Sequence, residues 1–248
     1  MSLCIQNLSV SFSKNVILDN LTIPEIHSGE IVSLIGKNGA GKSTLLKQMT
    51  KLFRLNPELI TLNGKPLTLD DIGYLPQDHR ISASITVVEL LITTMHVSVN
   101  SLFIKANSAE KALALLERIG ILHLANKTCT ELSGGESQMV GLAQAIINEP
   151  KVLILDEPSS ALDMQNQLKL LEYVKTYTRE YSACTLMVVH DLNLAIQYSD
   201  KVAALDNGKL FTYGEPKKII DKQLIYNLFN VNSQIIQLDE YPVVVVRS

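Results

Sequence analysis

The chain has 248 residues and a formal net charge of −3, with 46% hydrophobic and 19% charged residues. This composition excludes a disordered chain, because enough apolar surface is present to build a core. The weak negative charge argues against a nucleic acid as the main partner, since phosphate backbones attract basic surfaces. Cys4, Cys129 and Cys184 form no CxxC pair, which indicates buried free thiols in a reducing compartment and not a disulfide framework or a zinc site.

Neither a membrane span nor a secretion signal is predicted. No apolar run approaches the roughly 18 residues that cross a bilayer, and residues 1–13 lack a basic region followed by an apolar one. We therefore expect a soluble, cytoplasmic chain. The mean hydropathy of +0.17 is high for such a chain. It indicates either a large core of buried strands or extra apolar surface that meets a partner.

The first part of the chain predicts strands and one helix. Residues 3–10 alternate roughly between apolar and polar, residues 17–26 form a second strand region, and residues 31–35 form a compact apolar run that ends at Gly36. A helix is predicted over residues 42–49 and a short strand over residues 72–75. The order of strand, glycine-rich loop and helix is typical of an α/β fold.

The middle of the chain differs, because residues 86–147 carry no strong strand signal. Val87, Leu90 and Leu91 have helical spacing, as do Ala112 and Leu116. Ser108 is a possible helix N-cap without a full capping box. We interpret residues 86–148 as a helical subdomain inserted into a core formed by residues 1–85 and 149–248.

Strand signals return after this insertion. Residues 152–155 and 186–189 read as buried strands, separated by a helix over residues 165–181. Residues 202–205 and 210–213 flank Asn207-Gly208, a strong hairpin signal. Residues 235–246 predict two more short strands. The whole chain is therefore predicted to be a single α/β domain with a mixed or parallel sheet, an N-terminal antiparallel β subdomain and the helical insertion.

A glycine-rich segment at residues 36–43 matches the phosphate-loop pattern GxxxxGK[ST]. Its glycines let several backbone N–H groups point inward at phosphate oxygens, and the following helix N-terminus adds partial positive charge. Lys42 is expected to reach the β- and γ-phosphates of ATP, and Ser43 to bind Mg²⁺. The residues expected to contact the nucleotide here are Gly36, Asn38, Gly39, Gly41, Lys42, Ser43 and Thr44.

Two carboxylates follow the apolar strand at residues 152–155. In an open α/β sheet this places Asp156 and Glu157 at the carboxyl end of the strand, beside the phosphate loop. Asp156 suits Mg²⁺, and Glu157 suits a general base that polarises the attacking water. By themselves two such acids are common at exposed loop starts, so the phosphate loop decides the interpretation.

A third motif carries a family resemblance. Leu132-Ser133-Gly134-Gly135-Glu136 resembles the signature LSGGQ of the ABC ATPases. In the same order, residues 74–77 resemble the Q-loop, residues 160–163 the D-loop, and His190 the switch histidine. The resemblance covers the whole chain.

The resemblance implies the remaining site residues. Gln77, Glu157 and His190 would be catalytic, and Gln77 would also reach Mg²⁺ together with Ser43 and Asp156. Phe12 occupies the place of an aromatic that stacks on adenine, although packing in the core stays an alternative. The further nucleotide contacts implied are Ser133, Gly134, Gly135, Glu136 and Asp163. The family arrangement is a head-to-tail dimer with ATP between the phosphate loop of one copy and the signature of the other.

The sequence departs from the family pattern at three positions. Glu136 replaces the usual Gln, while Met139 and Gln144 replace two usual arginines, which puts in doubt the ion pairs that this helix normally makes. The resemblance still implies a second anion site at the signature.

The resemblance further implies a transport ATPase that docks on separate permease subunits at the inner face of the membrane and works indirectly with a substrate-binding protein. Residues 190–195, 198–202 and 225–231 resemble the importers of iron siderophores, haem and vitamin B12, whereas residues 94–105 do not. An ATPase of an ABC exporter and a non-transport ABC ATPase remain alternatives.

Overall fold

A six-stranded mixed sheet with the order β10-β9-β3-β8-β7-β6 forms the centre of the molecule. The computed structural model describes residues 1–13, 15–50, 59–77, 79, 81–97, 107–238 and 241–247. The strands from β9 to β6 run parallel, and β10 pairs antiparallel with β9 at one edge. Their bounds are β3 (Ile31–Ile35), β6 (Ile72–Leu75), β7 (Val152–Asp156), β8 (Cys184–Val188), β9 (Lys201–Asp206) and β10 (Lys209–Gly214).

The central strands are continuous apolar runs because both faces of the sheet are covered. In β7, Val152 and Ile154 belong to the core under the N-terminal sheet. Leu153 and Leu155 point to the opposite face and belong to the core shared with the helices. The period of two along each strand thus divides one apolar run between two cores.

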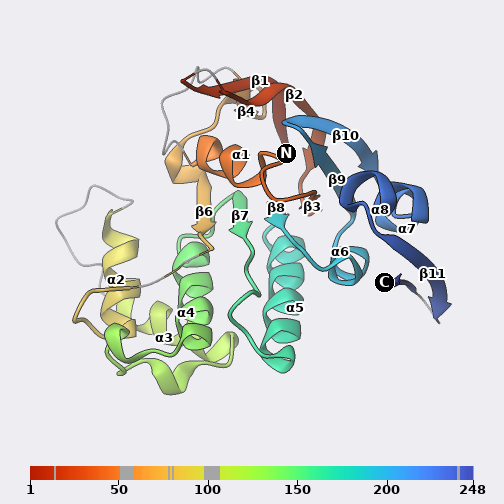
Figure 1. Ribbon diagram of the computed structural model, residues 1–248. Coiled ribbons are helices and arrows are strands. Elements are labelled where there is room, and N and C mark those ends of the chain that lie inside the picture. The colour runs from red at the N-terminus through yellow and green to blue at the C-terminus, as the bar shows by residue number, and fades with distance from the viewer. Residues whose placement is uncertain are drawn as a thin grey trace.

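The N-terminal β subdomain is a four-stranded antiparallel sheet with the order β2-β1-β4-β5. It consists of β1 (Ser2–Phe12), β2 (Asn15–His27), β4 (Ile60–Leu62) and β5 (Lys65–Pro66). Leu3, Ile5, Leu8 and Val10 are buried and face the central sheet core. Figure 1 shows this subdomain at the top of the molecule, above α1 (Lys42–Met49).

The helical region lies on the opposite side of the molecule from the N-terminal sheet (Figure 1). Its elements are α2 (Val87–Val97), α3 (Ser108–Arg118), η3 (Leu122–Leu124), η4 (Cys129–Glu131) and α4 (Gly134–Ile146). The short helix η2 (Leu69–Asp71) lies outside this region, directly before β6. The helices α5 (Met164–Glu180) and α6 (Leu192–Tyr198) connect the central strands. One buried cluster joins α2, α3, α4 and α5 to one face of the sheet.

The C-terminal part adds a third core. It contains α7 (Pro216–Ile219), α8 (Lys222–Phe229), and the hairpin of β11 (Asn232–Leu238) and β12 (Tyr241–Arg247). Ile225 and Leu228 of α8 pack there with Val244 and with Ile196 of α6. Among the described residues, no helix is both long and apolar enough to cross a membrane.

Most predicted elements agree with the structure, and two details are corrected. The second buried strand was placed at residues 186–189, but β8 begins at Cys184 and ends at Val188. Ser108 is the first residue of α3, and Asn107 is the N-cap without a side-chain capping bond. The Ser108 hydroxyl lies instead 3.4 Å from Nε2 of His96 on α2. The sequence pattern does not predict β4, β5, α6, α7 or α8. Of the stretch 94–105, residues 98–105 lie outside the described residues.

Candidate nucleotide site

The phosphate loop connects β3 to α1 in a backbone conformation that its glycines allow. Gly36, Gly39 and Gly41 have φ angles of 145°, 83° and 100°. A Cβ atom at Gly36 would lie 2.3 Å from the carbonyl oxygen of Leu205, and one at Gly41 would lie 2.5 Å from Leu18. The loop is therefore pressed between β9 and β2, and both positions require glycine.

Lys42 is almost completely buried, with 6% of its surface exposed. Its Nζ donates hydrogen bonds to the carbonyl oxygens of Gly36 at 2.7 Å and Lys37 at 3.0 Å. Burial lowers the pKa of the Lys42 ammonium, while the nearby carboxylates of Glu157 and Asp156 oppose this shift. A buried cation beside a helix N-terminus that has no side-chain cap is well suited to an anionic ligand.

Asp156 ends β7 and is buried. Ser43 Oγ donates to its Oδ1 at 3.5 Å. Burial raises the pKa of the Asp156 carboxyl, and the neighbouring Glu157 charge raises it further. A hydroxyl and a carboxylate are hard oxygen ligands that fit Mg²⁺, which takes its other ligands from phosphate and water. The described residues contain no group of three or more His, Cys, Asp or Glu arranged to hold a metal by themselves.

Glu157 follows β7 with a left-handed φ of 51°, which is uncommon for a non-glycine residue. Gln77 Nε2 donates to its Oε2 at 2.8 Å, and His190 Nε2 lies 2.5 Å from its Oε1. Both carboxylate oxygens are thus held, one by a residue after β6 and one by a residue after β8. The three predicted catalytic residues therefore meet at the carboxyl ends of three adjacent strands.

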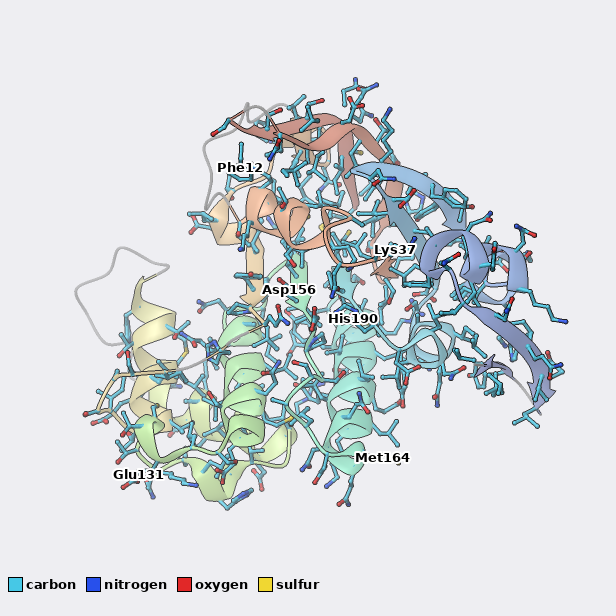
Figure 2. All side chains as sticks on the ribbon, in the orientation of Figure 1. Phe12, Lys37, Glu131, Asp156, Met164 and His190 are labelled. Carbon is cyan, nitrogen blue, oxygen red and sulfur yellow. The ribbon has the colours of Figure 1, made fainter. Side chains whose placement is uncertain are left out.

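A cavity of about 590 Å³ opens beside these groups. Its lining residues are Ile17, Asn38, Gly39, Gly41, Lys42, Ser43, Thr44, Gln77, Glu157 and His190. Ile17 was not predicted as a site residue; its position on β2, just after the turn that follows Phe12, is the signal that could have identified it. Phe12 at the end of β1 is 44% exposed and hence not a core residue. Figure 2 shows Asp156 and His190 near each other at the centre and Phe12 above them.

The signature segment (residues 132–136) forms the N-terminus of α4. Ser133 is the N-cap: its Oγ accepts from the backbone N–H of Glu136 at 3.3 Å, and its own N–H donates to Glu136 Oε2 at 2.7 Å. Lys127 Nζ donates to both carboxylate oxygens of Glu136, each at 2.9 Å. These contacts lower the pKa of Glu136 to about 2, with the Lys127 bond as the largest cause.

Among the described residues, neither the signature segment nor Asp163 lines the phosphate-loop cavity of the same chain. Asp163 caps α5, since its side chain accepts from the N–H of Asn166 at 2.8 Å. In Figure 2, Glu131, just before the signature segment, lies at the lower left, away from Lys37, Asp156 and His190. The N-termini of α1 and α4 in one chain are thus separate from each other (Figure 2).

The loop after Gln77 is attached to α4. Ser137 Oγ donates to the carbonyl oxygen of His79 at 2.6 Å, and a Cβ atom at Gly141 would lie 2.5 Å from the His79 ring. Gln138 Nε2 donates to the Glu157 carbonyl oxygen at 3.4 Å. The signature helix is therefore in contact with both His79, two residues after Gln77, and the backbone of Glu157.

Met139 and Gln144, which stand where the family usually has arginine, have different surroundings. Met139 is buried in the core of the helical region, so an apolar side chain fits this position of α4. Gln144 is only partly buried.

Comparison with known proteins agrees with the motifs described above. The family model described as ABC transporter matches residues 18–160, more than half of the chain. The chain belongs to the ABC transporter family. As an ABC ATPase it binds and hydrolyses ATP.

Relatives match this ABC ATPase over nearly its whole length. It is 32% identical over 244 residues to the iron(3+)-hydroxamate import ATP-binding protein FhuC of Bacillus subtilis, covering 95% of this chain and 90% of the relative. It is 34% identical over 253 residues to the hemin import ATP-binding protein HmuV of Photobacterium damsela subsp. piscicida, covering 96% and 93%. A chain of an ABC transporter solved in an inward-facing conformation has a TM-score of 0.86 and 25% identity, covering 100% of this chain and 97% of that one.

Proposed function

We propose that this ABC ATPase works as a head-to-tail dimer that energises the import of an iron chelate, such as a siderophore complex or haem, or of cobalamin, through separate permease subunits. The similarity to relatives named as import ATP-binding proteins for iron(3+)-hydroxamate and hemin supports import and this cargo class. Its place would be the inner face of the cell membrane. The proposed division is a nucleotide-binding core of residues 1–85 and 149–248 with a helical signature subdomain of residues 86–148.

The observation that carries the chemistry is the double contact on Glu157. As general base, Glu157 would accept a proton from the attacking water. His190 would hold the carboxylate on one oxygen and Gln77 on the other, at 2.5 and 2.8 Å. Removing either contact would let the carboxylate rotate away from the phosphate loop, so both residues would act by orienting the base.

Mg²⁺ would be held by Ser43 and Asp156, with the amide oxygen of Gln77 within the same site. When bound, it would neutralise phosphate charge. The Lys42 ammonium would leave the carbonyls of Gly36 and Lys37 for the β- and γ-phosphates. Phe12 and Ile17 would form the apolar contact for the adenine and ribose.

The second half of each nucleotide site would come from the other copy. Ser133, Gly134 and Gly135 offer one hydroxyl and the first N–H groups of α4, which have no intrahelical acceptors. Since they lie away from the chain's own phosphate loop, a two-fold partner would bring them to the nucleotide, with Glu136 and Asp163 beside them.

Coupling to a permease would run through the loop after β6. Gln77 touches Glu157, and His79 is attached to α4 two residues later. A short cytoplasmic helix of a permease that docks beside this loop and α2 would thus sense the nucleotide state. Residues 94–105 would choose the permease. A substrate-binding protein would deliver the cargo to that permease.

Mixing two inactive variants tests the dimer. Chains with Ser133→Arg mixed with chains with Lys42→Ala form one composite site with both lesions and one with neither, so part of the ATPase activity should return. The matched control mixes Lys42→Ala with Glu157→Gln. Both lesions then lie on the phosphate-loop side, no intact site forms, and no activity should return. Equal behaviour of the two mixtures would contradict the trans arrangement, unless both sites must act together. ATP-dependent dimerisation of Glu157→Gln, followed by light scattering, separates these outcomes.

Reconstitution tests the transport proposal. The permease of a neighbouring gene and this ATPase should co-purify, and vesicles containing both should take up a ferric siderophore, haem or cobalamin in an ATP-dependent manner. A permease that binds the ATPase without ATP-driven uptake of any of these would contradict the cargo class. An ATPase rate that no adjacent-gene permease changes would contradict the transport role itself.

A further inference from the structure

The signature end of α4 carries a negative charge at the place where an anion is expected. Glu136 is the third residue of the helix, and its carboxylate turns back to the N–H of Ser133. The Ser133 N–H and the Glu136 N–H are therefore already paired within the chain. The groups left for a phosphate are the Ser133 hydroxyl hydrogen and the N–H groups of Gly134 and Gly135.

A carboxylate in the first turn works against phosphate binding at the same turn. It uses the favourable field of the helix N-terminus, and it repels a phosphate that carries the same sign of charge. The uncharged glutamine that is usual at this position would form the same capping box without that repulsion.

In the structure, the Lys127 ammonium neutralises the Glu136 carboxylate. The ammonium is 2.9 Å from each oxygen of the Glu136 carboxylate, so the pair is a close, two-oxygen contact. The Lys127 backbone is fixed on both sides, since its N–H donates to the Leu124 carbonyl at 2.9 Å and its carbonyl accepts from the Val87 N–H at 3.1 Å. The side chain therefore starts from a rigid position between η3 and the N-terminus of α2.

We infer that Lys127 is a positioning residue of the trans nucleotide site, which neutralises Glu136 and holds its carboxylate in the capping box so that the N-terminus of α4 can receive the phosphates bound to the partner copy. The inference rests on the proposed trans role of Ser133. It assigns Lys127, nine residues before the carboxylate it neutralises, to the site.

Three variants test this inference in the full-length protein. Lys127→Met removes the charge at similar length, Glu136→Gln restores the uncharged residue, and the third variant combines both. Lys127→Met should raise the KM for ATP on the order of fivefold and change kcat less, because the uncompensated carboxylate repels the nucleotide. The KM of Glu136→Gln should equal or fall below that of the unmodified chain. The combined variant should return to within about twofold of Glu136→Gln.

Salt and a matched charge change provide the controls. The KM defect of Lys127→Met should shrink as ionic strength rises from about 0.05 to about 0.5 M, since exposed charges are screened. Lys151→Met breaks the ion pair of Lys151 with Asp71, 2.8 Å long and at the opposite end of β7 from Asp156. It removes the same charge and should leave the KM for ATP unchanged. Lys127→Arg should keep the low KM.

The result that overturns the inference is a combined variant as impaired as Lys127→Met, because a merely structural role of Lys127 would not depend on the charge at residue 136. An unaltered KM in Lys127→Met overturns it as well. If the single Lys127→Met variant does not fold, a combined variant that folds and has the KM of Glu136→Gln supports the inference, because the charge at residue 136 then causes the defect. A combined variant that also fails to fold overturns it. If mixing of Ser133→Arg and Lys42→Ala chains restores activity but the Lys127 variants show no coupling, this inference fails while the dimer proposal stands.

Discussion

The helix ends of α1 and α4 both suit phosphate, but they are built in different ways. Helix α1 begins after Gly41 in a left-handed conformation, without a side-chain cap and without an acidic residue in its first turn. Helix α4 begins with the Ser133 capping box and has Glu136 in its first turn. The first end leaves its donors to the ligand and adds the Lys42 cation. The N-terminus of α4 pairs some of its hydrogen-bond donors within the chain and therefore offers fewer donors to the ligand. The difference predicts tight binding by the phosphate loop and a weaker, completing contact by the signature.

The largest effect is expected at Glu157. Glu157→Gln keeps the shape of the site, and its amide cannot accept a proton, so kcat should fall on the order of 10²–10⁴-fold while ATP still binds. Steady-state ATPase assays and nucleotide-binding titrations measure the two quantities separately. Turnover at the normal rate would show that another group removes the proton.

Changing the phosphate-loop helix end should weaken ATP binding strongly. Lys42→Ala removes the buried ammonium and should weaken ATP binding by about 10–100-fold, the range for a hydrogen bond to a charged group. Calorimetric titration of the purified chain measures this. Ser133→Arg, changed at the other helix end, should leave ATP binding to the isolated chain nearly intact. Equal losses in the two variants would contradict the proposed ranking.

Glycine-to-alanine substitutions should change the free energy of unfolding differently at the N-termini of α1 and α4. Gly36→Ala places a Cβ 2.3 Å from the Leu205 carbonyl oxygen at a φ of 145° and should destabilise the fold by about 3 kcal/mol or prevent folding. Gly134→Ala meets only Ala161 at 3.9 Å and should keep or raise stability by up to about 1 kcal/mol. Urea unfolding measures both. ATPase activity of Gly134→Ala should still fall, because the Cβ lies where phosphate would approach.

The smallest predicted effect is on the stability of the fold at acidic pH. Because the folded-state pKa of Glu136 is about 2 and its ordinary value is 4.5, its contribution is complete above pH 4.5 and is lost as pH falls towards about 2. For Asp156, whose pKa is raised, protonation on acidification favours the folded state instead. Glu136→Gln should lose less stability than the unmodified chain over this range, by on the order of 1 kcal/mol or less for a partly exposed pair. Unfolding titrations between about pH 5 and 2 measure the difference; parallel curves would contradict it.

Sequence patterns predicted the strands and helices that carry the nucleotide site because each has a local signal. The runs at residues 31–35 and 152–155 are apolar throughout since both faces are buried, and Gly36 and Lys42 belong to a motif of fixed spacing. The short strands β4 and β5 and the helices α6 to α8 have no comparable signal. Their residues are held by packing, as in the contacts of Ile225 and Ile196 within the C-terminal core.

The sequence by itself determined the family, the α/β class, the phosphate loop and the acidic pair, because these depend on residues close together in the chain. Only the tertiary structure decided how Glu157 is held. Its partners Gln77 and His190 lie 80 and 33 residues away, and they meet only because β6, β7 and β8 are neighbours in the sheet. It also decided the pairing of Lys127 with Glu136. No helical or strand period relates two residues separated by the turns of η4, so only the folded backbone brings that cation to the signature.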